Sequence, residues 1–473
     1  MNQKKQLLAN TIIIALGKLG TQIVSFILLP LYTAQLSTEE YGTYDFLVTL
    51  SVFLLPIITL LIEESMFRFL IDAETTKDKK KIITATTLYM LAGTIFFSII
   101  ATIVVLLSGY QYGWLFIVFV ISNILISLSN AISRGMGKIK IYSISNFFLG
   151  ALTIILNLVF ILAFKWGTAG LLWANTIANA IVAIFVLIRM RFLSYVNMKN
   201  LNKRTLREMV KYSVPLVPNN LSWIIISLSD RLMITWLIGS GANGIYSIAN
   251  RFPNIIYTCY GFFSTAWKES AARIVKEDNK NEYYNAIYKD LVNFLKAIVI
   301  GLIAVMPFAF KILIAEGYND AYVYIPILTI GIYYTNISNF YGGIFTAYKD
   351  TKIMGTTTMF GAFLNVLINL IFLKLWGIYA ATISTLVSTL VVYLYRRAKL
   401  KKYIRLRENI DLTYFVVLAI VLITYYIRNN IVSAIILVFA VIYCYSINRK
   451  FINTILRKGK NRILRKKQAA KLS

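Results

Sequence analysis

The stretch LSTEEYGTY at residues 36–44 has a counterpart 202 residues later, IGSGANGIY at residues 238–246, and both end in Gly-x-Tyr. The same order of motifs continues along the chain. LNLVF at 156–160, followed by Trp166-Gly167, corresponds to INLIF at 368–372, followed by Trp376-Gly377, and residues 137–140 correspond to 349–352. Repeated halves are typical of membrane transporters. The repeat therefore predicts two copies of one helical lobe.

The composition places the chain in a membrane. Of 473 residues 58% are apolar and only 15% are charged, with a mean hydropathy of +0.68, whereas about 25% charged residues is usual in a soluble domain. The absence of histidine excludes His-based acid/base catalysis and imidazole metal sites. The two cysteines, Cys259 and Cys444, lie far apart in apolar runs, so we expect neither a disulfide framework nor a metal site.

Fourteen apolar runs are candidate spans, since a transmembrane helix needs roughly 20 mostly apolar residues. They are residues 9–31, 44–69, 82–107, 114–132, 142–164, 168–188, 212–238, 244–267, 291–314, 322–348, 353–373, 377–395, 412–427 and 431–447. The first run is too long for a signal peptide, so we expect it to remain as a span. Of the 49 Lys and Arg, 40 fall in alternate segments, 3 in the loops between them and 6 within spans. By the positive-inside rule this alternation predicts that both termini are cytoplasmic.

The predicted fold class is an all-α integral membrane protein with about 14 transmembrane helices. Residues 1–190 form an N-lobe of helices 1 to 6, residues 191–211 a cytoplasmic linker, and residues 212–395 a C-lobe of helices 7 to 12 around a central cavity. Residues 396–448 add two C-terminal helices. Residues 449–473 form a basic cytoplasmic tail that we expect on anionic membrane lipids. The net charge of +29 is therefore positive-inside bias, and nucleic acid is not an expected partner.

Several of these motifs together resemble a known family. The two Gly-x-Tyr loops, SDRLMI at residues 229–234, ESMFRF at residues 64–69 and the Asn and Trp-Gly ends of both repeats are similar to the polysaccharide transporter branch of the multidrug/oligosaccharidyl-lipid/polysaccharide exporter superfamily. That branch includes O-antigen and capsule-unit flippases and is related to the lipid II flippase. The resemblance covers nearly all of residues 1–395, and the two further helices resemble those of fourteen-span members, in which they can shape a lipid-facing groove.

The resemblance implies a flippase of the bacterial cytoplasmic (inner) membrane. Two lobes would move an undecaprenyl-pyrophosphate-linked oligosaccharide, a surface polysaccharide repeat unit, from the inner to the outer leaflet by alternating access. Polysaccharide polymerase and glycosyltransferases are the protein partners that it implies. It implies no enzyme activity, no catalytic residue and no cofactor other than a coupling ion.

Cations inside predicted spans are the candidate substrate-binding residues, because a buried charge needs a partner or a cavity. Lys18 shares a helical face with Gln22, and Arg251 shares one with Asn254. The basic residues of these two helices line the cavity in the related lipid-flippase family, so the resemblance supports Lys18 and Arg251 as contacts for the diphosphate. For the polar face that carries Lys18 and Gln22, hydrogen bonding between helices is the alternative role. Arg231 is a further candidate, for substrate or for a structural ion pair.

Acids inside predicted spans are the candidates for H⁺ or Na⁺ coupling, although the sequence leaves open whether transport is coupled. Glu63 has no local base and is the first candidate, with Asp230 and Asp45 as competitors. Glu64 and Arg68 are four residues apart, so we expect them to form a structural pair.

Two rival functions fit the composition. A drug or cation antiporter of the same superfamily would favour a cavity rich in carboxylates, whereas the spans here hold acids and bases in similar numbers. A membrane glycosyltransferase or polymerase would favour long loops with acidic residues, but the predicted outer loops are only a few residues long.

Overall fold

A computed structural model describes residues 28–275, 277–407 and 411–469, and this part of the chain is helical throughout. The helices are α2 (Leu29–Gln35), α3 (Thr38–Thr59), α4 (Ile62–Asp72), α5 (Thr76–Ser108), α6 (Gly113–Gly135), α7 (Ile139–Leu158), α8 (Gly167–Arg189), α9 (Lys203–Ser213), α10 (Leu216–Leu237), α11 (Ser240–Ile274), α12 (Lys280–Leu313), α13 (Ile325–Ala347), α14 (Thr351–Trp376), α15 (Ile378–Leu400), α16 (Leu412–Ile427) and α17 (Asn430–Ala469). A π-helical segment, Val159–Ala163, extends α7, and short 3₁₀ segments occupy Phe192–Ser194, Met198–Asn200 and Glu316–Tyr324.

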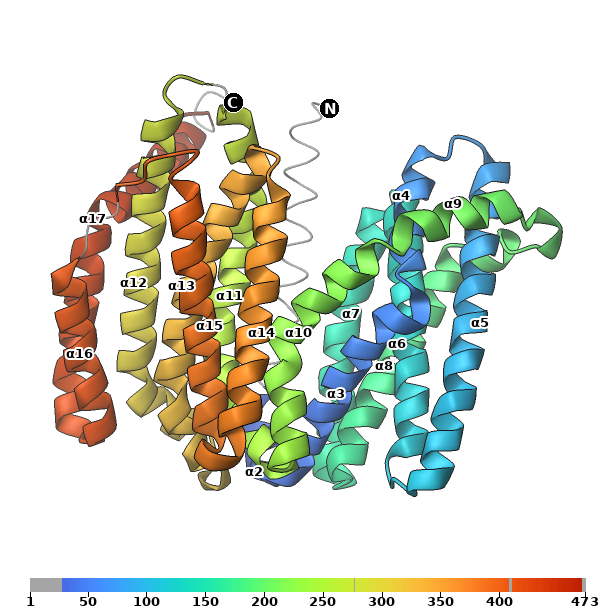
Figure 1. Cartoon of the computed structure of the whole chain (residues 1–473), viewed down its shortest axis with the longest axis horizontal. Helices are drawn as coiled ribbons and strands as arrows, with labels where there is room; N and C mark the ends of the chain where they lie inside the picture. The colour runs from blue at the N-terminus through green and yellow to red at the C-terminus, as the bar shows by residue number, and fades with distance from the viewer. Residues whose placement is uncertain (1–27, 276, 408–410, 470–473) are drawn as a thin grey trace. The chain divides into compact units, whose positions relative to one another are not determined.

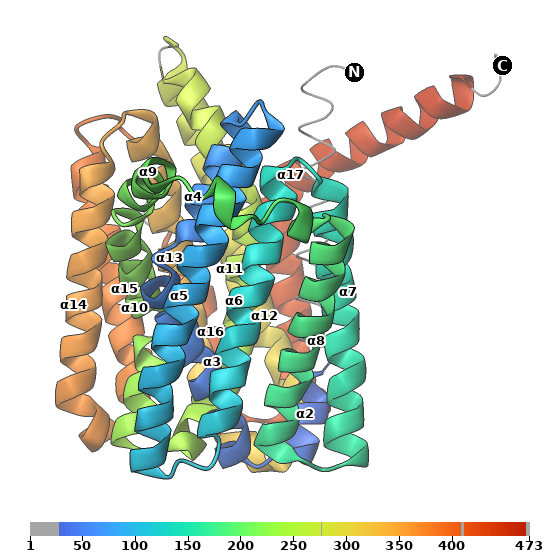
Figure 2. The same ribbon diagram turned by 90° about the vertical axis from the view of Figure 1, so that its right-hand side faces the viewer.

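The helices gather into two compact units. The first extends to Ser247 and includes Ala315–Tyr318 and Asn369–Gly377; the second contains Ile248–Ile314, Asn319–Ile368 and the chain from Ile378 onward. In the first unit α6 packs against α5 and α8, and α3 packs against α10, as Figures 1 and 2 show. In the second, α13 packs against α15, and α12 packs against α17. The lobe boundaries drawn from the sequence repeat remain a prediction.

The internal repeat is visible in the backbone. Gly167 and Gly377, which follow the paired tryptophans, have φ of +52° and +55°. Gly137 and its counterpart Lys349 have φ of +71° and +60°. Left-handed conformations are uncommon and suit glycine. Their recurrence at equivalent positions indicates that both copies end and restart their helices in the same way.

An all-helical membrane protein is confirmed, with nine helices in the described residues that are long and apolar enough to cross a bilayer. The predicted spans at 212–238, 244–267 and 322–348 are helical as α10, α11 and α13, although they are less apolar than those nine. Several of their polar side chains are buried inside the protein, as Asp230, Ser247 and Asn336 illustrate. α16 has only 16 residues. Most of the first predicted span, residues 9–31, lies outside the described residues.

The predicted span 44–69 is broken rather than continuous. α3 ends at Thr59, α4 begins at Ile62, and between them Leu60 and Leu61 have φ of +47° and +54°. A left-handed leucine costs roughly 1–2 kcal/mol, because its Cβ approaches the following carbonyl oxygen. Burial compensates for this cost, since Ile62 and Met66 immediately after the break are fully buried in the apolar core of the first unit.

Candidate functional site

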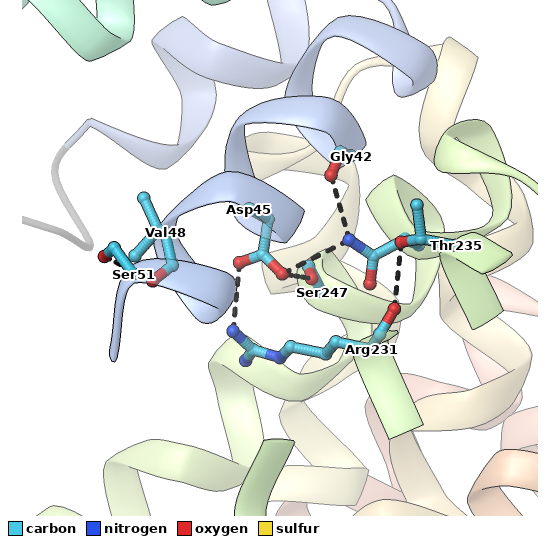
Figure 3. Close-up of polar contacts among 8 residues, drawn as sticks. Gly42, Asp45, Val48, Ser51, Arg231, Thr235 and Ser247 are labelled. Atoms are coloured by element: carbon cyan, nitrogen blue, oxygen red, sulfur yellow. Dashed lines mark hydrogen bonds and ion pairs between the residues drawn. The ribbon is translucent and has the colours of Figure 1, made fainter. Parts of the chain in front are cut away.

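A buried polar cluster in the first unit surrounds Asp45 (Figure 3). The carboxylate is 4% exposed, and Arg231 of α10 donates to its Oδ1 over 3.0 Å. From α11, Ser247 donates to Oδ2 over 2.5 Å and the Asn243 amide lies 3.4 Å from the same oxygen. A buried carboxylate is stable only when it is paired and hydrogen-bonded. Asp45 therefore fastens α3 to both α10 and α11.

This cluster is one place where the two sequence repeats meet. Gly42 and Gly244 are equivalent positions, and the two glycines lie against each other: a Cβ on Gly42 would fall 1.7 Å from the Ser240 carbonyl oxygen, and one on Gly244 would fall 2.1 Å from that of Thr38. Thr38 and Ser240 are themselves equivalent. Each copy thus places its glycine against the other copy's helix start, which is the reciprocal contact expected about a two-fold axis. Close approach is possible only because neither residue has a side chain.

The entry to α3 is fixed locally by its sequence. Ser37 accepts a hydrogen bond from the backbone N–H of Glu40 over 3.1 Å, and the Glu40 carboxylate accepts one from the backbone N–H of Ser37 over 2.9 Å. This capping box satisfies two donors at the helix start. It sets the direction in which α3 carries Gly42 and Asp45 toward the second copy.

Asp230, adjacent to Arg231, belongs to a second buried group. Tyr246 of α11 donates to one carboxylate oxygen over 2.7 Å, and Asn369 of α14 donates to the other over 2.5 Å. Asn369 is the asparagine of the second INLIF-type motif. Consecutive helical residues point about 100° apart, which explains how Asp230 and Arg231 serve different neighbours. Asp230 and Arg231 thus both form contacts between helices. Of the two roles considered for Arg231, substrate contact and structural ion pair, this structure contains the ion pair.

Glu63 has an environment unlike that of the other two acids. It lies just after the Leu60–Leu61 break, is 5% exposed, and accepts a 3.3 Å hydrogen bond from Thr59 on one oxygen. Its other oxygen, Oε2, is buried with no partner among the described residues. A carboxyl group in this position favours a bound proton or a bound cation, because burial without compensation penalises the bare charge.

The predicted Glu64–Arg68 pair is corrected by the structure. Arg68 instead forms an ion pair with Asp72 at 2.6 Å, and the base nearest to Glu64 is Arg134 of α6, at 3.9 Å. The i,i+4 spacing is equally good for Arg68 and Asp72, so spacing alone does not decide between the two acids. Both contacts are largely exposed.

The proposed substrate contacts are only partly visible. Lys18 and Gln22 lie outside the described residues. Arg251 and Asn254 are half-buried on α11, and Arg251 lies one helical turn beyond Ser247, on the face that carries Asn243. The polar stripe predicted for this helix therefore begins at the Asp45 cluster.

One buried cation was missed by the sequence analysis. Arg396 of α15 is 1% exposed and donates to the Thr357 hydroxyl over 3.0 Å, the Thr358 hydroxyl over 2.8 Å and the Ser338 carbonyl over 2.9 Å. Within the described part of the chain its acceptors are neutral. It joins α13, α14 and α15. In the sequence it lies one residue beyond the predicted span 377–395, where a basic side chain normally extends toward water, so its burial was not expected.

Comparison with known proteins shows which family the chain resembles. The model of the polysaccharide biosynthesis protein family matches residues 7–267, more than half of the chain, and the MatE model matches residues 215–371. An archaeal relative, the uncharacterized membrane protein MJ1375 of Methanocaldococcus jannaschii, is 24% identical over 394 residues, which are 78% of this chain and 92% of the relative.

Two solved structures share the fold at low sequence identity. Lipid II flippase MurJ in an inward closed conformation has a TM-score of 0.68 and 16% identity, covering 93% of this chain and 100% of that one. A multidrug resistance MATE family transporter of the MOP superfamily, in an inward-facing conformation, has a TM-score of 0.61 and 14% identity, covering 81% and 95%. The first is thus a flippase and the second a transporter.

Proposed function

The chain belongs to the polysaccharide biosynthesis protein family of the MOP superfamily, and from this membership we propose that it is a flippase for an undecaprenyl-pyrophosphate-linked oligosaccharide. It would carry the lipid-linked repeat unit of a surface polysaccharide from the inner to the outer leaflet by alternating access. The Asp45–Arg231 contact between the repeats is the observation that carries the mechanism. In the proposed cycle this contact would be formed in one state and broken in the other, as an alternating-access mechanism needs.

The proposed topology has fourteen spans in a bacterial cytoplasmic membrane, with both termini cytoplasmic. Single cysteines in a background lacking Cys259 and Cys444 test this topology. Labelling from outside whole cells is expected at positions 38, 110 and 241 and not at 80, 203 and 401. Strong labelling at position 203 would contradict the fourteen-span topology.

The proposed substrate contacts are Lys18 with Gln22 and Arg251 with Asn254. Arginine binds a diphosphate through paired hydrogen bonds, and lysine binds it as a point charge. Arg231 would reach the substrate only after Asp45 releases it. Opening would thus exchange a protein carboxylate for a substrate phosphate, which couples binding to the conformational change.

Glu63 is the coupling site that we favour over Asp45 and Asp230. Those two carboxylates accept several hydrogen bonds each, whereas Oε2 of Glu63 has no partner among the described residues. Exchange of a proton or Na⁺ at Glu63, beside the strained Leu60–Leu61 break, would act on the backbone where the second span bends.

Flipping by reconstituted protein is the decisive experiment. Vesicles loaded with a fluorescent polyprenyl-diphosphate oligosaccharide report flipping as exposure of the glycan to an external glycosidase. A charge-assisted phosphate contact is worth roughly 1.5–3 kcal/mol, so Arg251→Ala is expected to weaken binding about 10- to 150-fold. Lys311→Ala is the matched control, because Lys311 is an exposed cation that donates to Asn430. Normal flipping by Arg251→Ala at wild-type abundance would remove Arg251 from the site.

The antiporter remains the rival, since the MatE model matches residues 215–371. Efflux of a cationic dye from the same vesicles, without any flipping of the oligosaccharide lipid, would favour it. Flipping without dye efflux supports the flippase.

A further inference from the structure

The two helices beyond the repeats are fastened to α12 in the second unit. Lys296 of α12 donates to Asp411 over 2.8 Å, and Asp411 also accepts from the backbone N–H of Tyr414, so it caps α16. α17 docks through amides, with Asn448 donating to the Asn293 carbonyl over 3.2 Å. α16 therefore has a fixed position beside α12.

A cavity of about 1390 Å³ that opens to the surface lies between α12, α13, α15, α16 and residues 401–407. All of its lining residues belong to the second unit. Ligand pockets are usually about 300–1,000 Å³, so this one is large enough for a lipid headgroup with the beginning of its chains.

The cavity has a basic end. Seven of the lining residues are Lys or Arg and two are acids, of which Asp411 is paired with Lys296. The remaining cations are Lys289, Arg397, Lys401, Lys402, Arg405 and Arg407. Lys289 lies near the start of α12, and the other five lie near the end of α15 and in the link to α16, at the side of the membrane that the charge pattern assigns to the cytoplasm. Such an excess attracts anionic lipid headgroups.

The basic end is held in place. The Asn285 side chain donates to the Arg405 carbonyl over 3.1 Å and accepts from the backbone N–H of Arg407 over 2.6 Å. Ile404 beside them is 3% exposed and anchors the link in the protein. The two arginine side chains themselves are exposed, so they are positioned by the backbone and available to a ligand.

The other end of the cavity is aromatic and apolar. Tyr333, Tyr393, Tyr414 and Leu390 line it, and Tyr333 and Tyr414 stack at 5.8 Å. Phe415, which also lines the cavity, is 47% exposed, so the apolar end continues onto the outer surface of α16. A soluble anion would gain nothing from this surface, whereas an acyl chain would bury apolar area there.

We propose that this cavity binds an anionic phospholipid of the surrounding membrane, with its phosphate at the basic end and the start of an acyl chain among the tyrosines. The lining contains no residue of the first unit and includes α16, which lies outside both repeats. A transported substrate has to meet both repeats in turn, so the cavity suits a resident lipid better than the cargo. The last two helices would then serve to build a lipid site.

Lipid binding to the purified full-length protein tests the proposal. Native mass spectrometry with phosphatidylglycerol and with phosphatidylcholine is expected to show retention of the anionic lipid alone. Each basic residue near an anionic headgroup contributes about a five-fold gain, so Arg405→Gln with Arg407→Gln should weaken phosphatidylglycerol binding about 30-fold. Lys374→Gln, an exposed cation at the end of α14 and outside the cavity, is the matched control.

The results of these binding measurements distinguish a phospholipid from a soluble anion and from the transported lipid. Unchanged melting temperature of the double variant shows that lost binding is local. Equal retention of both phospholipids, or unchanged binding by the double variant, overturns the proposal. So does displacement of the lipid by inorganic diphosphate, which would indicate a soluble anion. Stronger, arginine-dependent binding of a polyprenyl diphosphate would assign the cavity to the cargo instead.

Discussion

Two of the ion pairs among the described residues, Asp45–Arg231 and Lys296–Asp411, join helices far apart in the sequence, and they differ in what surrounds them. The Asp45–Arg231 pair of the first unit has side chains that are 6% and 16% exposed and joins the two sequence repeats. The Lys296–Asp411 pair of the second unit leaves the Asp411 side chain 35% exposed and joins an appended helix to α12. Removing one partner of a buried ion pair is costly, because the other charge stays buried without a partner. In a partly solvated pair, water can take the place of the lost partner. We therefore expect the first pair to contribute more to stability than the second, which fastens α16 to α12.

The largest expected effect is that of Asp45→Ala. It leaves the Arg231 charge unpaired at a site that is only 16% exposed; breaking a buried pair in this way typically costs 3–5 kcal/mol, so we expect a large loss of folded protein. Thermal unfolding in detergent, followed by size-exclusion chromatography, measures it. The double variant Asp45→Leu with Arg231→Met should recover much of the lost stability, and a fully stable Asp45→Ala would remove the distinction between the two pairs.

Gly42→Ala is expected to have the next largest effect. The new Cβ would fall 1.7 Å from a backbone oxygen, so α3 and α11 must separate, and overpacking of this kind typically costs 1–3 kcal/mol. Gly355→Ala in α14 is the control, because nothing lies within 4 Å of its added Cβ. The melting temperatures of the two variants decide the matter. Equal temperatures would mean that the repeats do not rely on close approach.

Lys296→Met should cost less than either, since Asp411 keeps water and its backbone donors. We expect a decrease of at most about 1 kcal/mol. Burial tends to raise the pKa of Asp411, but the hydrogen bond from Lys296 and those from the start of α16 lower it overall. A lowered pKa stabilises the fold above the ordinary value of about 3.9 and loses this contribution as pH falls through the lowered value. The contribution of the Lys296–Asp411 pair to stability should therefore not change between pH 8 and pH 5, which unfolding curves at several pH values can check.

Glu63→Gln is expected to have the smallest effect on stability and a specific effect on transport. Glu63 forms no ion pair among the described residues, so replacing its carboxylate leaves no cation unpaired, and the melting temperature should hardly change. Flipping driven by an imposed pH or Na⁺ gradient should lose its dependence on the gradient. Persistence of that dependence would exclude Glu63 and turn attention to Asp230. Glu64→Gln should be mild as well, because Arg68 is paired with Asp72.

The sequence could predict what depends on composition and periodicity: the helical membrane fold, the repeat and the buried acids. It could not predict which charges meet. Asp45 and Arg231 are 186 residues apart, and nothing local marks them as partners. Local spacing favoured Glu64 for Arg68, yet Asp72 has the same spacing. The Leu60–Leu61 break was also invisible, since leucine normally avoids the left-handed conformation and only tertiary packing imposes it.

The reciprocal glycine contact has a consequence for the origin of the chain. A surface that places Gly42 against the start of the second copy, and Gly244 against the start of the first, is self-complementary. A half-length ancestor with this loop would have closed on an identical molecule as a homodimer. In such a dimer every change appears twice, so a carboxylate at position 45 would face a second carboxylate. A single chain with both copies is free of that constraint, and this one has aspartate in one copy and Ser247 in the other, which donates to it.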